Sequence, residues 1–479
     1  MAVFIRRTNG ARRRARGHRR RERLALLFVL GALVAAACTQ RSDAGADLET
    51  SAAISPASAA HTSDIVAPTP IRPNPTRSPE EACRGGAIVG SNGSVSCGGN
   101  IGFRGLSPAY ALAIQADGKI VAVGGTGMYT GGGYDNNFAL ARYNPDGSAD
   151  QTFGDGGRVA TQLEFFQEAH GVAIQNDEGI VVAGSPSYGG AGTVSLARYR
   201  SDGTPDPSFS ENGWVDLPWV GRAFAVAVQP DGKILSLGAG AVQGIVLARY
   251  LPNGDLDPAF GSDGLVTSSP DPGSSTAYSL GIQPDGRIVV AGRSAGAVLL
   301  ARFQADGTAD RTFGSNGLVT ARFARGPNIA FGLVIQPDGG IVVTGRAGDA
   351  LLLARFEPNG SLDGTFGRGG GTITDLTTRA DIGRGVALQA NGRIVVAGGM
   401  GMVFEKGGLP RIGASVVIRY QHDGALDASF GRHGLSTTAF GERVGIANSV
   451  AIGASERIVV VGLAGRREKS FGFAEFGSE

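Results

Sequence analysis

Residues 138–161 have the sequence FALARYNPDGSADQTFGDGGRVAT. Similar sequences follow as IVLARYLPNGDLDPAFGSDGLVT from Ile245 and as VLLARFQADGTADRTFGSNGLVT from Val298. In each copy an apolar run leads into Asp-Gly or Asn-Gly, and an Arg stands eight residues before an Asp. This favours a tight turn, because Gly tolerates positive φ and Asp or Asn accepts local backbone hydrogen bonds. The stretch therefore predicts a strand, a turn and a further short strand in every copy.

A second motif lies between these copies and completes the repeat. The sequence IQADGKIVAVGG begins at Ile114, and similar sequences follow at intervals of 53 to 64 residues. The equivalent positions are Gln115, Gln175, Gln229, Gln283, Gln336, Gln389 and Gly453. Together the two motifs predict four short antiparallel strands per copy, with Val, Ile and Leu on both faces, as sheets packed between neighbours require. Seven copies at this spacing are typical of a propeller.

The two ends of the repeat region indicate how the array closes. The last copy provides three strands before Glu479, while SNGSVSCGGNIGFRG from Ser91 reads as a turn followed by a strand. A fourth strand supplied by this N-terminal segment would leave no exposed sheet edge at the junction. The sequence therefore predicts an all-β, seven-bladed β-propeller over residues 85–479, with four antiparallel strands per blade and the last blade closed by the N-terminal strand.

The combined unit also resembles a known repeat. Q-x-D-G-K/R-I-V-V-x-G followed by L-A-R-Y/F-x-x-D-G-x-x-D-x-x-F-G is similar to the bacterial delta-60 repeat, and the match runs from about Gly85 to Phe476. The resemblance implies a β-propeller in an exported protein. It carries over no catalytic residue, because that family is not tied to one activity.

The Arg and Asp eight residues apart are the most regular polar feature of the repeat. The pairs are Arg142–Asp150, Arg198–Asp206, Arg249–Asp257, Arg302–Asp310, Arg355–Asp363 and Arg419–Asp427. In the closing blade the equivalent positions hold Glu475 and Ser96, so both partners are absent together. This joint absence predicts a structural ion pair that pins the turn between the third and fourth strands. The alternative is a set of Ca²⁺ sites built from the Asp and Asn of the turns, although these loops lack the acidic density of an EF-hand.

The N-terminus predicts export. Residues 1–37 combine the basic stretch RRTNGARRRARGHRRRER with the apolar LALLFVLGALVAAA, which is short for a membrane span. Because it ends directly before Cys38, this signal peptide resembles a bacterial lipoprotein signal, which implies cleavage before Cys38 and lipid attachment to it. An ordinary secretory signal is the alternative. The chain carries a net charge of +2, of which residues 1–37 contribute +9, so the remainder is mildly acidic and nucleic acid is not an expected partner.

The segment after the signal predicts a tether. Residues 38–84 are rich in Ser, Ala, Thr and Pro and cannot bury enough apolar surface to fold. Cys83 and Cys97 are the two other cysteines, and in an exported protein they predict a disulfide. Closing this loop would contribute about 3 kcal/mol in the chain-entropy model. Two free thiols are the alternative.

Candidate partner-binding residues lie where the repeats differ from one another. The loops between the second and third strands are long in blades one, two, six and seven, which become neighbours when the ring closes. Variable loops on a constant scaffold often carry binding residues, with Tyr, Trp and Arg as anchors. The candidates in these loops and in the links between blades are Tyr129, Tyr134, Asp135, Glu168, His170, Tyr188, Trp219, Arg384, Lys406 and Arg411. The alternative is that these loops are solvated surface.

Catalytic motifs are absent from the sequence. It contains no G-x-S-x-G, H-E-x-x-H or P-loop, so we expect no catalytic residue, metal or cofactor. We expect a protein that is lipid-anchored at the cell envelope, at the outer membrane or cell surface, and binds a protein, peptide or glycan partner. The alternatives are an envelope enzyme acting on a polysaccharide or small molecule at the channel mouth, and a purely structural or adhesive surface module.

The lipid anchor can be tested by metabolic labelling in cells. Replacing Cys38 with Ala removes the thiol that would be acylated, so labelling by a palmitate analogue should fall to background. Cys83→Ser changes a cysteine away from the signal boundary and should keep full labelling. Retained labelling of the Cys38→Ala protein would contradict the lipoprotein interpretation.

Overall fold

The computed structural model describes residues 88–89, 95–96, 108–126, 137–162, 167–186, 193–240, 244–271, 273–403, 412–438, 445–464 and 470–476. These residues belong to the second of two compact units, Thr69–Glu479. The predicted signal peptide (1–37) and tether (38–84) lie outside the described residues, as do Cys38, Cys83 and Cys97. The lipid anchor and the disulfide therefore remain predictions.

Every repeat unit begins with two long strands. The first strands are β3 (Ala109–Ile114), β7 (Gln167–Ile174), β10 (Trp214–Val228), β14 (Thr276–Ile282), β18 (Asn328–Ile335), β22 (Ala380–Leu388) and β26 (Gly445–Ile452). The second strands are β4 (Ile120–Thr126), β8 (Ile180–Pro186), β11 (Ile234–Gly240), β15 (Ile288–Ser294), β19 (Ile341–Ala347), β23 (Ile394–Val403) and β27 (Ile458–Ala464). A short 3₁₀ helix, η2 (Ala454–Glu456), joins β26 to β27.

The outer strands complete the units. The third strands are β5 (Asn137–Tyr143), β9 (Thr193–Tyr199), β12 (Ile245–Tyr250), β16 (Ala297–Phe303), β20 (Ala350–Phe356), β24 (Ile412–Tyr420) and β28 (Ser470–Phe476). The separate fourth strands are β6 (Arg158–Thr161), β13 (Leu265–Ser268), β17 (Leu318–Ala321), β21 (Gly371–Thr374) and β25 (Leu435–Thr438). Two very short strands, β1 (Ile88–Val89) and β2 (Val95–Ser96), precede the first unit.

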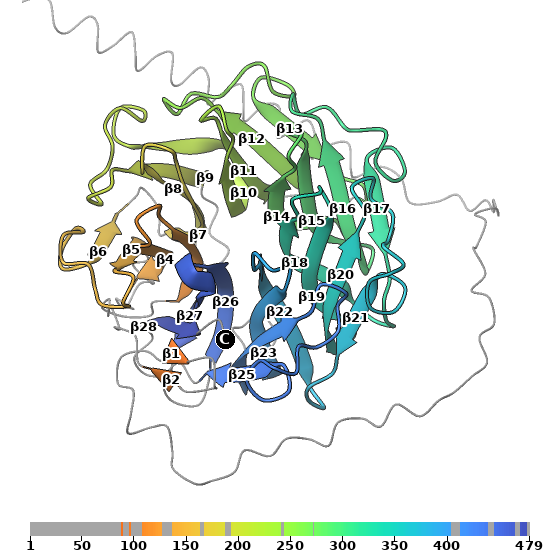
Figure 1. The fold of residues 1–479 in the computed structure, drawn as a ribbon. Helices are drawn as coiled ribbons and strands as arrows, with labels where there is room; N and C mark the ends of the chain where they lie inside the picture. Colours follow the sequence, from red (N-terminus) through yellow and green to blue (C-terminus); the bar gives the residue numbers. More distant parts are fainter. Residues whose placement is uncertain are drawn as a thin grey trace, which may run out of the picture. The chain divides into compact units, whose positions relative to one another are not determined.

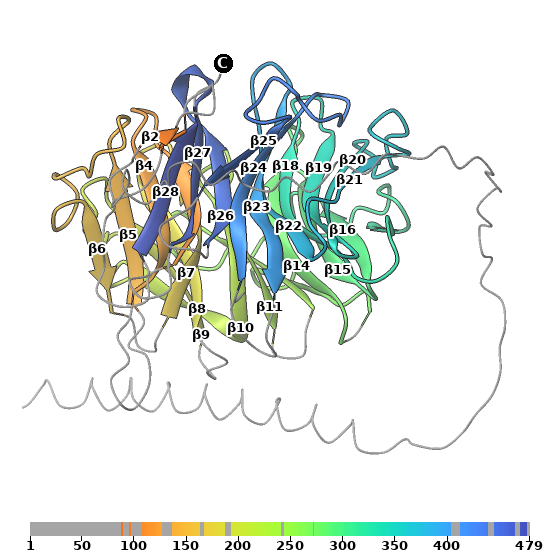
Figure 2. The same ribbon diagram turned by 90° about the horizontal axis from the view of Figure 1, so that it is seen from below.

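The middle strands of each unit are buried on both faces, as expected from their continuous runs of apolar residues. All seven residues of β4 and of β16 are buried, whereas β6 at the outer edge alternates between exposed and half-buried positions. Val289 and Leu300 of one unit pack in one cluster with Ile341 and Val343 of the next. Each such side chain contributes about 1.5–3 kcal/mol when it is fully buried. The core is therefore a series of interfaces between successive sheets, which stand face to face in Figure 2.

The first strands are innermost, and the series of units closes on itself. The sheets lie around a common centre with β7, β14, β22 and β26 facing it (Figure 1). Each first strand packs against the first strand of the next unit, and β26 of the last unit packs against β3 of the first. At this junction the Asn448 Nδ2 donates a hydrogen bond to the Ala109 carbonyl oxygen at 2.8 Å. The described residues of the compact unit Thr69–Glu479 thus form the β-propeller that the repeats predict.

The predicted count of seven separate blades needs correction. The described strands form six hydrogen-bonded sheets, because the second and third repeat units share one seven-stranded sheet. The cause is β10, which runs for 15 residues without interruption. Its beginning, Trp214–Asp216, pairs with β9, and its end, Gly221–Val228, pairs with β11. One strand therefore serves as the fourth strand of one unit and the first strand of the next.

The N-terminal segment joins the last sheet, but in a different way from the expected antiparallel fourth strand. The order of this sheet is β2-β1-β28-β27-β26. Val89 of β1 pairs with Phe476 of β28 in parallel orientation, and β2 then pairs with β1 in antiparallel orientation. A short hairpin forces neighbouring strands to be antiparallel. No such connection links β1 to β28, because the two strands come from opposite ends of the chain, so this constraint is absent.

The Arg and Asp of every complete repeat form an ion pair. In all six, the Arg Nε donates to the Asp Oδ2 at 2.6–2.8 Å. The guanidinium also lies over the Phe ring that follows the Asp, and the Arg302 Cζ is 4.5 Å from the Phe313 centroid. Arg302 and Asp310 are 5% and 1% exposed, so the pair is shielded from water.

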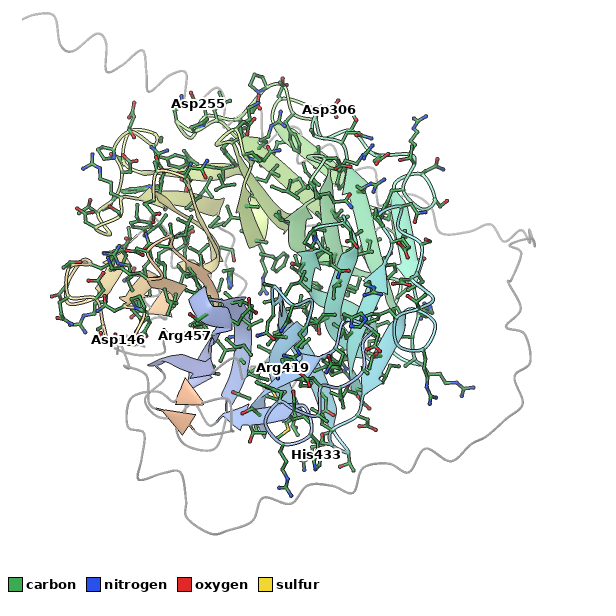
Figure 3. All side chains as sticks on the ribbon, in the orientation of Figure 1. Asp146, Asp255, Asp306, Arg419, His433 and Arg457 are labelled. Atoms are coloured by element: carbon green, nitrogen blue, oxygen red, sulfur yellow. The ribbon has the colours of Figure 1, made fainter. Side chains whose placement is uncertain are left out.

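The same Arg also connects neighbouring units. The Nη1 of Arg198 donates to the Pro252 carbonyl oxygen at 2.6 Å, and that of Arg355 donates to the His422 carbonyl oxygen at 2.6 Å. Both acceptors lie in the turn between the third and fourth strands of the next unit. Where the last unit lacks this Arg, the Arg457 Nη2 donates to the Pro145 carbonyl oxygen of the first unit. Figure 3 shows Arg457 beside Asp146 at this junction.

The remaining oxygen of each Asp is used as well, which bears on the Ca²⁺ alternative. The Asp310 Oδ1 accepts hydrogen bonds from the Thr312 hydroxyl at 2.7 Å and amide at 3.1 Å. Burial by itself would raise the pKa of Asp310, but these hydrogen bonds and the charge of Arg302 outweigh it and hold the pKa below the ordinary 3.8. Both carboxylate oxygens thus have protein donors, and the geometry favours the ion pair over a cation site.

The coupling of this pair can be tested by a double-mutant cycle on the free energy of unfolding. Arg302→Ala leaves the buried Asp310 with only the partly exposed Arg287 at 3.1 Å, so we expect a loss of about 3 kcal/mol, with a similar or larger loss for Asp310→Ala, which removes the partner of both arginines. The double variant should lose much less than the sum, because neither unpaired charge remains. Arg158→Ala, at a pair whose side chains are 47% and 91% exposed, should change stability little. Strict additivity of the Arg302 and Asp310 losses would refute the coupling.

Candidate functional site

The first strand of every unit carries a bulged residue at the same place in the repeat, and β22 has a second irregularity nearer its beginning. In β14, Ala277 pairs with Gly292 and Ser279 with Ala291, so Tyr278 between them has no partner in β15. The same irregularity occurs at the same place in all seven first strands. A bulge at a sheet edge re-aims a side chain. The bulged residues, which we call the axial ring, are Tyr110, His170, Phe224, Tyr278, Phe331, Arg384 and Asn448.

A glycine in the second strand makes each bulge possible. This glycine is the last residue of the I-V-V-x-G motif, and it pairs with the residue just before the bulge. A Cβ on Gly292 would lie 1.9 Å from the Thr276 carbonyl oxygen, and one on Gly345 would lie 1.9 Å from that of Ile329. No side chain fits at such distances, so this position requires Gly. The motif that builds the second strand thereby creates the bulge in the first.

The residues on either side of the bulge are small, which leaves the ring residue as the one that reaches the centre. Ala277 and Ala330 are fully buried, whereas Tyr278 and Phe331 are half-buried. A Cβ on Gly385, directly after Arg384, would lie 2.9 Å from the backbone nitrogen of Val450 in the next unit. The backbones of neighbouring units are therefore close together, and the bulged residues carry the large, partly exposed side chains at this level of the strands.

The ring side chains contact one another across unit boundaries. The ring centroids of Tyr110 and His170 are 4.6 Å apart, and the Tyr278 centroid lies 5.2 Å from that of Phe224 and 5.3 Å from that of Phe331. The Arg384 Cζ lies 4.7 Å from the Phe331 centroid. These distances are typical of favourable aromatic and cation–π contacts. Six of the seven side chains therefore contact a neighbour in the axial ring, and Asn448 instead bonds the Ala109 backbone.

One side of the axial ring is polar and internally bonded. The Tyr110 hydroxyl donates to the Glu168 Oε2 at 2.9 Å. Burial within the ring of strands, and then the charge of Arg222, lower the pKa of His170 to about 4. His170 is therefore neutral at pH 7, and its ring is tilted by 47° to that of Tyr110. On this side the Tyr110 hydroxyl is therefore already hydrogen-bonded, and the imidazole of His170 carries no charge.

The other side is aromatic and holds a cation. Burial lowers the pKa of Arg384, with weak support for the charge from Tyr278 and Tyr110, but a guanidinium stays protonated at pH 7. Among the described residues the buried Arg384 Nε has no hydrogen-bond partner. Phe331, Tyr278 and Phe224 continue from Arg384 in successive contacts. This side therefore presents the positive charge of Arg384 at the end of a row of three aromatic side chains.

The acidic residue closest to Arg384 in the chain has a different role. Asp381 is fully buried at the beginning of β22, where its carboxylate accepts hydrogen bonds from the Leu376 amide at 2.7 Å and the Gly401 amide at 2.9 Å. Burial raises the pKa of Asp381, and these donors act against the rise. Asn328 holds the loop before β18 in the same way, through bonds to the Phe323 and Ala324 amides. Asp381 therefore positions the backbone and does not face the ring.

The structure brings together two of the residues that the sequence singles out, Glu168 and His170, which both contact Tyr110, and it places a third, Arg384, on the other side of the ring. Glu168, His170 and Arg384 lie on first strands, the last two in the axial ring. Trp219 lies in β10, but its side chain is outside the described part of the chain. The other candidates that lie outside the described residues are Tyr129, Tyr134, Asp135, Tyr188, Lys406 and Arg411.

Sequence reasoning missed the rest of the ring. The missed members are Tyr110, Phe224, Tyr278, Phe331 and Asn448. They stand five residues before the aligned Gln or Gly position of their repeats, between small residues, and a comparison of the seven copies at that position would have found them.

Other features of the described residues do not define a site. No three of their His, Cys, Asp or Glu side chains are grouped in a way that could hold a metal ion. A surface hollow involving Thr312, Leu318 and Asn359 is lined by the turn between third and fourth strands, which recurs in other units. None of the described helices has the length and hydropathy needed to cross a bilayer.

Six segments of the chain match a family model described as "Domain of unknown function (DUF5122) beta-propeller". The matched residues are 115–153, 175–209, 229–260, 283–313, 336–366 and 389–430. Each segment runs from the aligned Gln to the Phe that contacts the paired Arg. The match therefore identifies the scaffold motif of the repeat and leaves out the axial ring.

Comparison with solved structures finds other molecules of similar fold. They include a streptogramin B lyase (11% identity, 78% of this chain and 96% of that one, TM-score 0.45) and YCF48 from Cyanidioschyzon merolae (13%, 79% and 98%, 0.44). A protein of unknown function from Bacteroides caccae is a further example (12%, 69% and 97%, 0.40). At these identities and scores the likeness carries no argument about activity. No curated protein sequence matches the chain.

The low pKa of His170 predicts a pH dependence of stability. A His in the unfolded chain titrates near 6.5, so below that pH the unfolded state binds more protons than the folded state. His170 should therefore lower the free energy of unfolding progressively as the pH falls from 6.5 toward 4, and contribute no pH dependence above 6.5. His170→Phe, which places at this position the residue found at 224 and 331, should flatten the decline in urea unfolding measured at pH 7.5, 6.0 and 5.0. An unchanged decline would contradict the low pKa.

Proposed function

We propose, for a chain that carries six copies of the DUF5122 β-propeller repeat, a role as a binding module whose ligand is recognised at the axial ring. The ring and the four long loops would form one surface for a partner of the cell envelope. Export and lipid attachment at Cys38 are part of this proposal. So is the membership of the delta-60 family that the repeat resembles.

The observation that carries the proposal is the contrast between one variable position and its constant surroundings. The residue before the bulge is Ala in six units and Gly in the other, and the glycine opposite it is present in all seven. The bulged residue itself is Tyr, His, Phe, Arg or Asn. A purely structural position would repeat with the rest of the unit. Differentiation where side chains meet and remain open to solvent supports a binding surface.

The axial ring and the long loops belong to the same end of the strands. His170 in β7 lies opposite the step between Ala183 and Gly184, and β8 ends only two residues later at Pro186. Tyr110 lies opposite the step between Val123 and Gly124, and β4 ends at Thr126. The loops after Thr126 and Pro186 are two of the four long ones. These two loops therefore leave their sheets at the end of the strands where the ring lies.

An envelope hydrolase or lyase is the second candidate, because Tyr110, Glu168 and His170 combine groups that could transfer protons. Binding is the better supported role. A general base works best with a pKa near the operating pH, and about 4 for His170 makes it a weak proton acceptor at neutral pH. The aromatic and Arg-rich remainder of the ring is typical of recognition surfaces. A module with only structural or adhesive duties would need no differentiated ring.

A thermal-shift screen with matched variants tests the proposal. Separate pools of peptides, glycans and small metabolites would be added to the wild type, to an axial variant (Phe224→Ala with Tyr278→Ala) and to a peripheral variant (Asp155→Ala with Arg158→Ala). Binding to the folded state raises Tm by an amount set by ligand concentration over Kd. At least one pool should raise the Tm of the wild type and the peripheral variant, but not that of the axial variant.

Two results would count against binding at the ring. One is an equal rise in Tm for all three proteins, which would place the ligand elsewhere. The other is the absence of any rise with every pool. Chemical conversion of an active pool component by the wild type, abolished in Glu168→Gln, would instead support the second candidate.

A further inference from the structure

Arg384 differs from the structural arginines of the repeat in its surroundings. Arg302 has a carboxylate at 2.7 Å, and its Nη1 donates to the Pro358 carbonyl oxygen of the next unit. Arg384 has neither kind of partner among the described residues, and its Nε is buried without a hydrogen bond. Leaving a desolvated guanidinium unpaired is unfavourable, and such a cost is removed when an anion arrives. Among the described residues, the positive charge of Arg384 thus has no anionic partner.

The groups around Arg384 set the chemistry of that anion. Phe331 lies under the guanidinium at 4.7 Å and prevents a ligand from approaching that face. The edge of the guanidinium, with its fork of N–H donors, remains for a planar oxyanion such as a carboxylate. Tyr278 follows Phe331 at 5.3 Å, and among the described residues its hydroxyl makes no hydrogen bond. A second donor is therefore available beside an aromatic face.

The residues on the opposite side of the ring are less suited to bind an anion than Arg384 is. Glu168 adds a negative charge next to Tyr110 and already accepts that hydroxyl at 2.9 Å. Asn448 uses its Nδ2 to close the propeller on Ala109. An anion near these residues would meet Glu168 and Arg222, of which Arg222 is exposed and screened by solvent, whereas near Arg384 it meets a cation and neutral rings. The charge distribution across the ring thus directs a negative group to the Arg384 side.

We propose that the axial ring binds a small carboxylate carried on a six-membered ring whose face can pack on aromatic side chains, with Arg384 pairing with the carboxylate and Tyr278, Phe331 and Phe224 contacting the ring of the ligand. The inference rests on the proposed function and specifies the ligand class of the same site. An aromatic acid and a uronic acid share this chemistry. The test separates these two sources.

Isothermal titration calorimetry with defined probes tests the inference. The probes are phenylacetate, glucuronate, acetate, which lacks a ring, and 2-phenylethanol, which lacks a charge. Phenylacetate or glucuronate should bind the wild type at least about tenfold more tightly than acetate, and 2-phenylethanol should bind no better than acetate. The tighter of the two ring acids identifies the aromatic or the sugar source. Failure of both ring acids to bind at millimolar concentration would overturn the inference.

Two variants and a control assign the contact to residues. Arg384→Gln should weaken binding of the ring acid about tenfold to a hundredfold, since a hydrogen bond to a charged group is lost. Arg293→Gln is the matched control, because Arg293 also has a buried Nε without a partner but lies in β15, outside the axial ring. It should change the affinity less than twofold. Equal affinity of the wild type and Arg384→Gln would refute the role of Arg384.

Tyr278→Ala keeps the inference testable if Arg384→Gln does not fold. This variant keeps the cation and removes the aromatic face, so phenylacetate or glucuronate should weaken toward the affinity of acetate, with acetate itself unchanged. Unchanged binding of the ring acid would contradict the aromatic contact. Ligands that bind the ring without regard to their charge would overturn this inference alone, whereas ligands indifferent to every ring variant would overturn the proposed function as well.

Discussion

The buried ion pair between the third strand and the turn after it holds this propeller together. Arg302 bonds Asp310, covers the Phe313 ring and donates to the Pro358 carbonyl oxygen of the next unit. One side chain thus stabilises its own turn and the neighbouring interface. Where the last unit lacks this Arg, Arg457 bonds the turn of the first unit. Because a buried charge is costly without its partner, the contact also specifies how the units align, and six copies of it impose one geometry around the ring.

A scaffold stabilised in this way leaves its centre free to vary. The paired Arg and Asp lie on the outer strands and their turns, while the axial ring lies on the first strands, which contribute little to those contacts. The glycine opposite each bulge is the link between the two regions. Gly292 and Gly345 must be glycine because a carbonyl oxygen occupies the space of a Cβ. They turn one residue per unit toward the axis, whatever that residue is. The backbone of the bulge therefore accepts residues as different as Tyr278 and Arg384.

The candidate site could be predicted only in part. Glu168, His170 and Arg384 stand out in the sequence as polar or charged residues near the links between units. Tyr278 and Phe331 do not, because an aromatic residue inside an apolar strand reads as core. The bulge changes this interpretation, and a bulge is a property of the register between two strands. The chain places Gly292 and Tyr278 fourteen residues apart, and only the pairing of β14 with β15 brings the glycine and the bulge together.

By itself the sequence determined the repeat, the strand content, the tight Asp-Gly turns and the Arg–Asp pairs, because these depend on residues close together in one copy. Tertiary structure alone decided how the copies combine. β10 continues through two units and merges their sheets, and β1 meets β28 in parallel, since both outcomes depend on where a strand ends in space. The unpaired state of Arg384 is of the same kind. Whether a charge finds a partner depends on six other units converging on one axis, which no single stretch of the chain specifies.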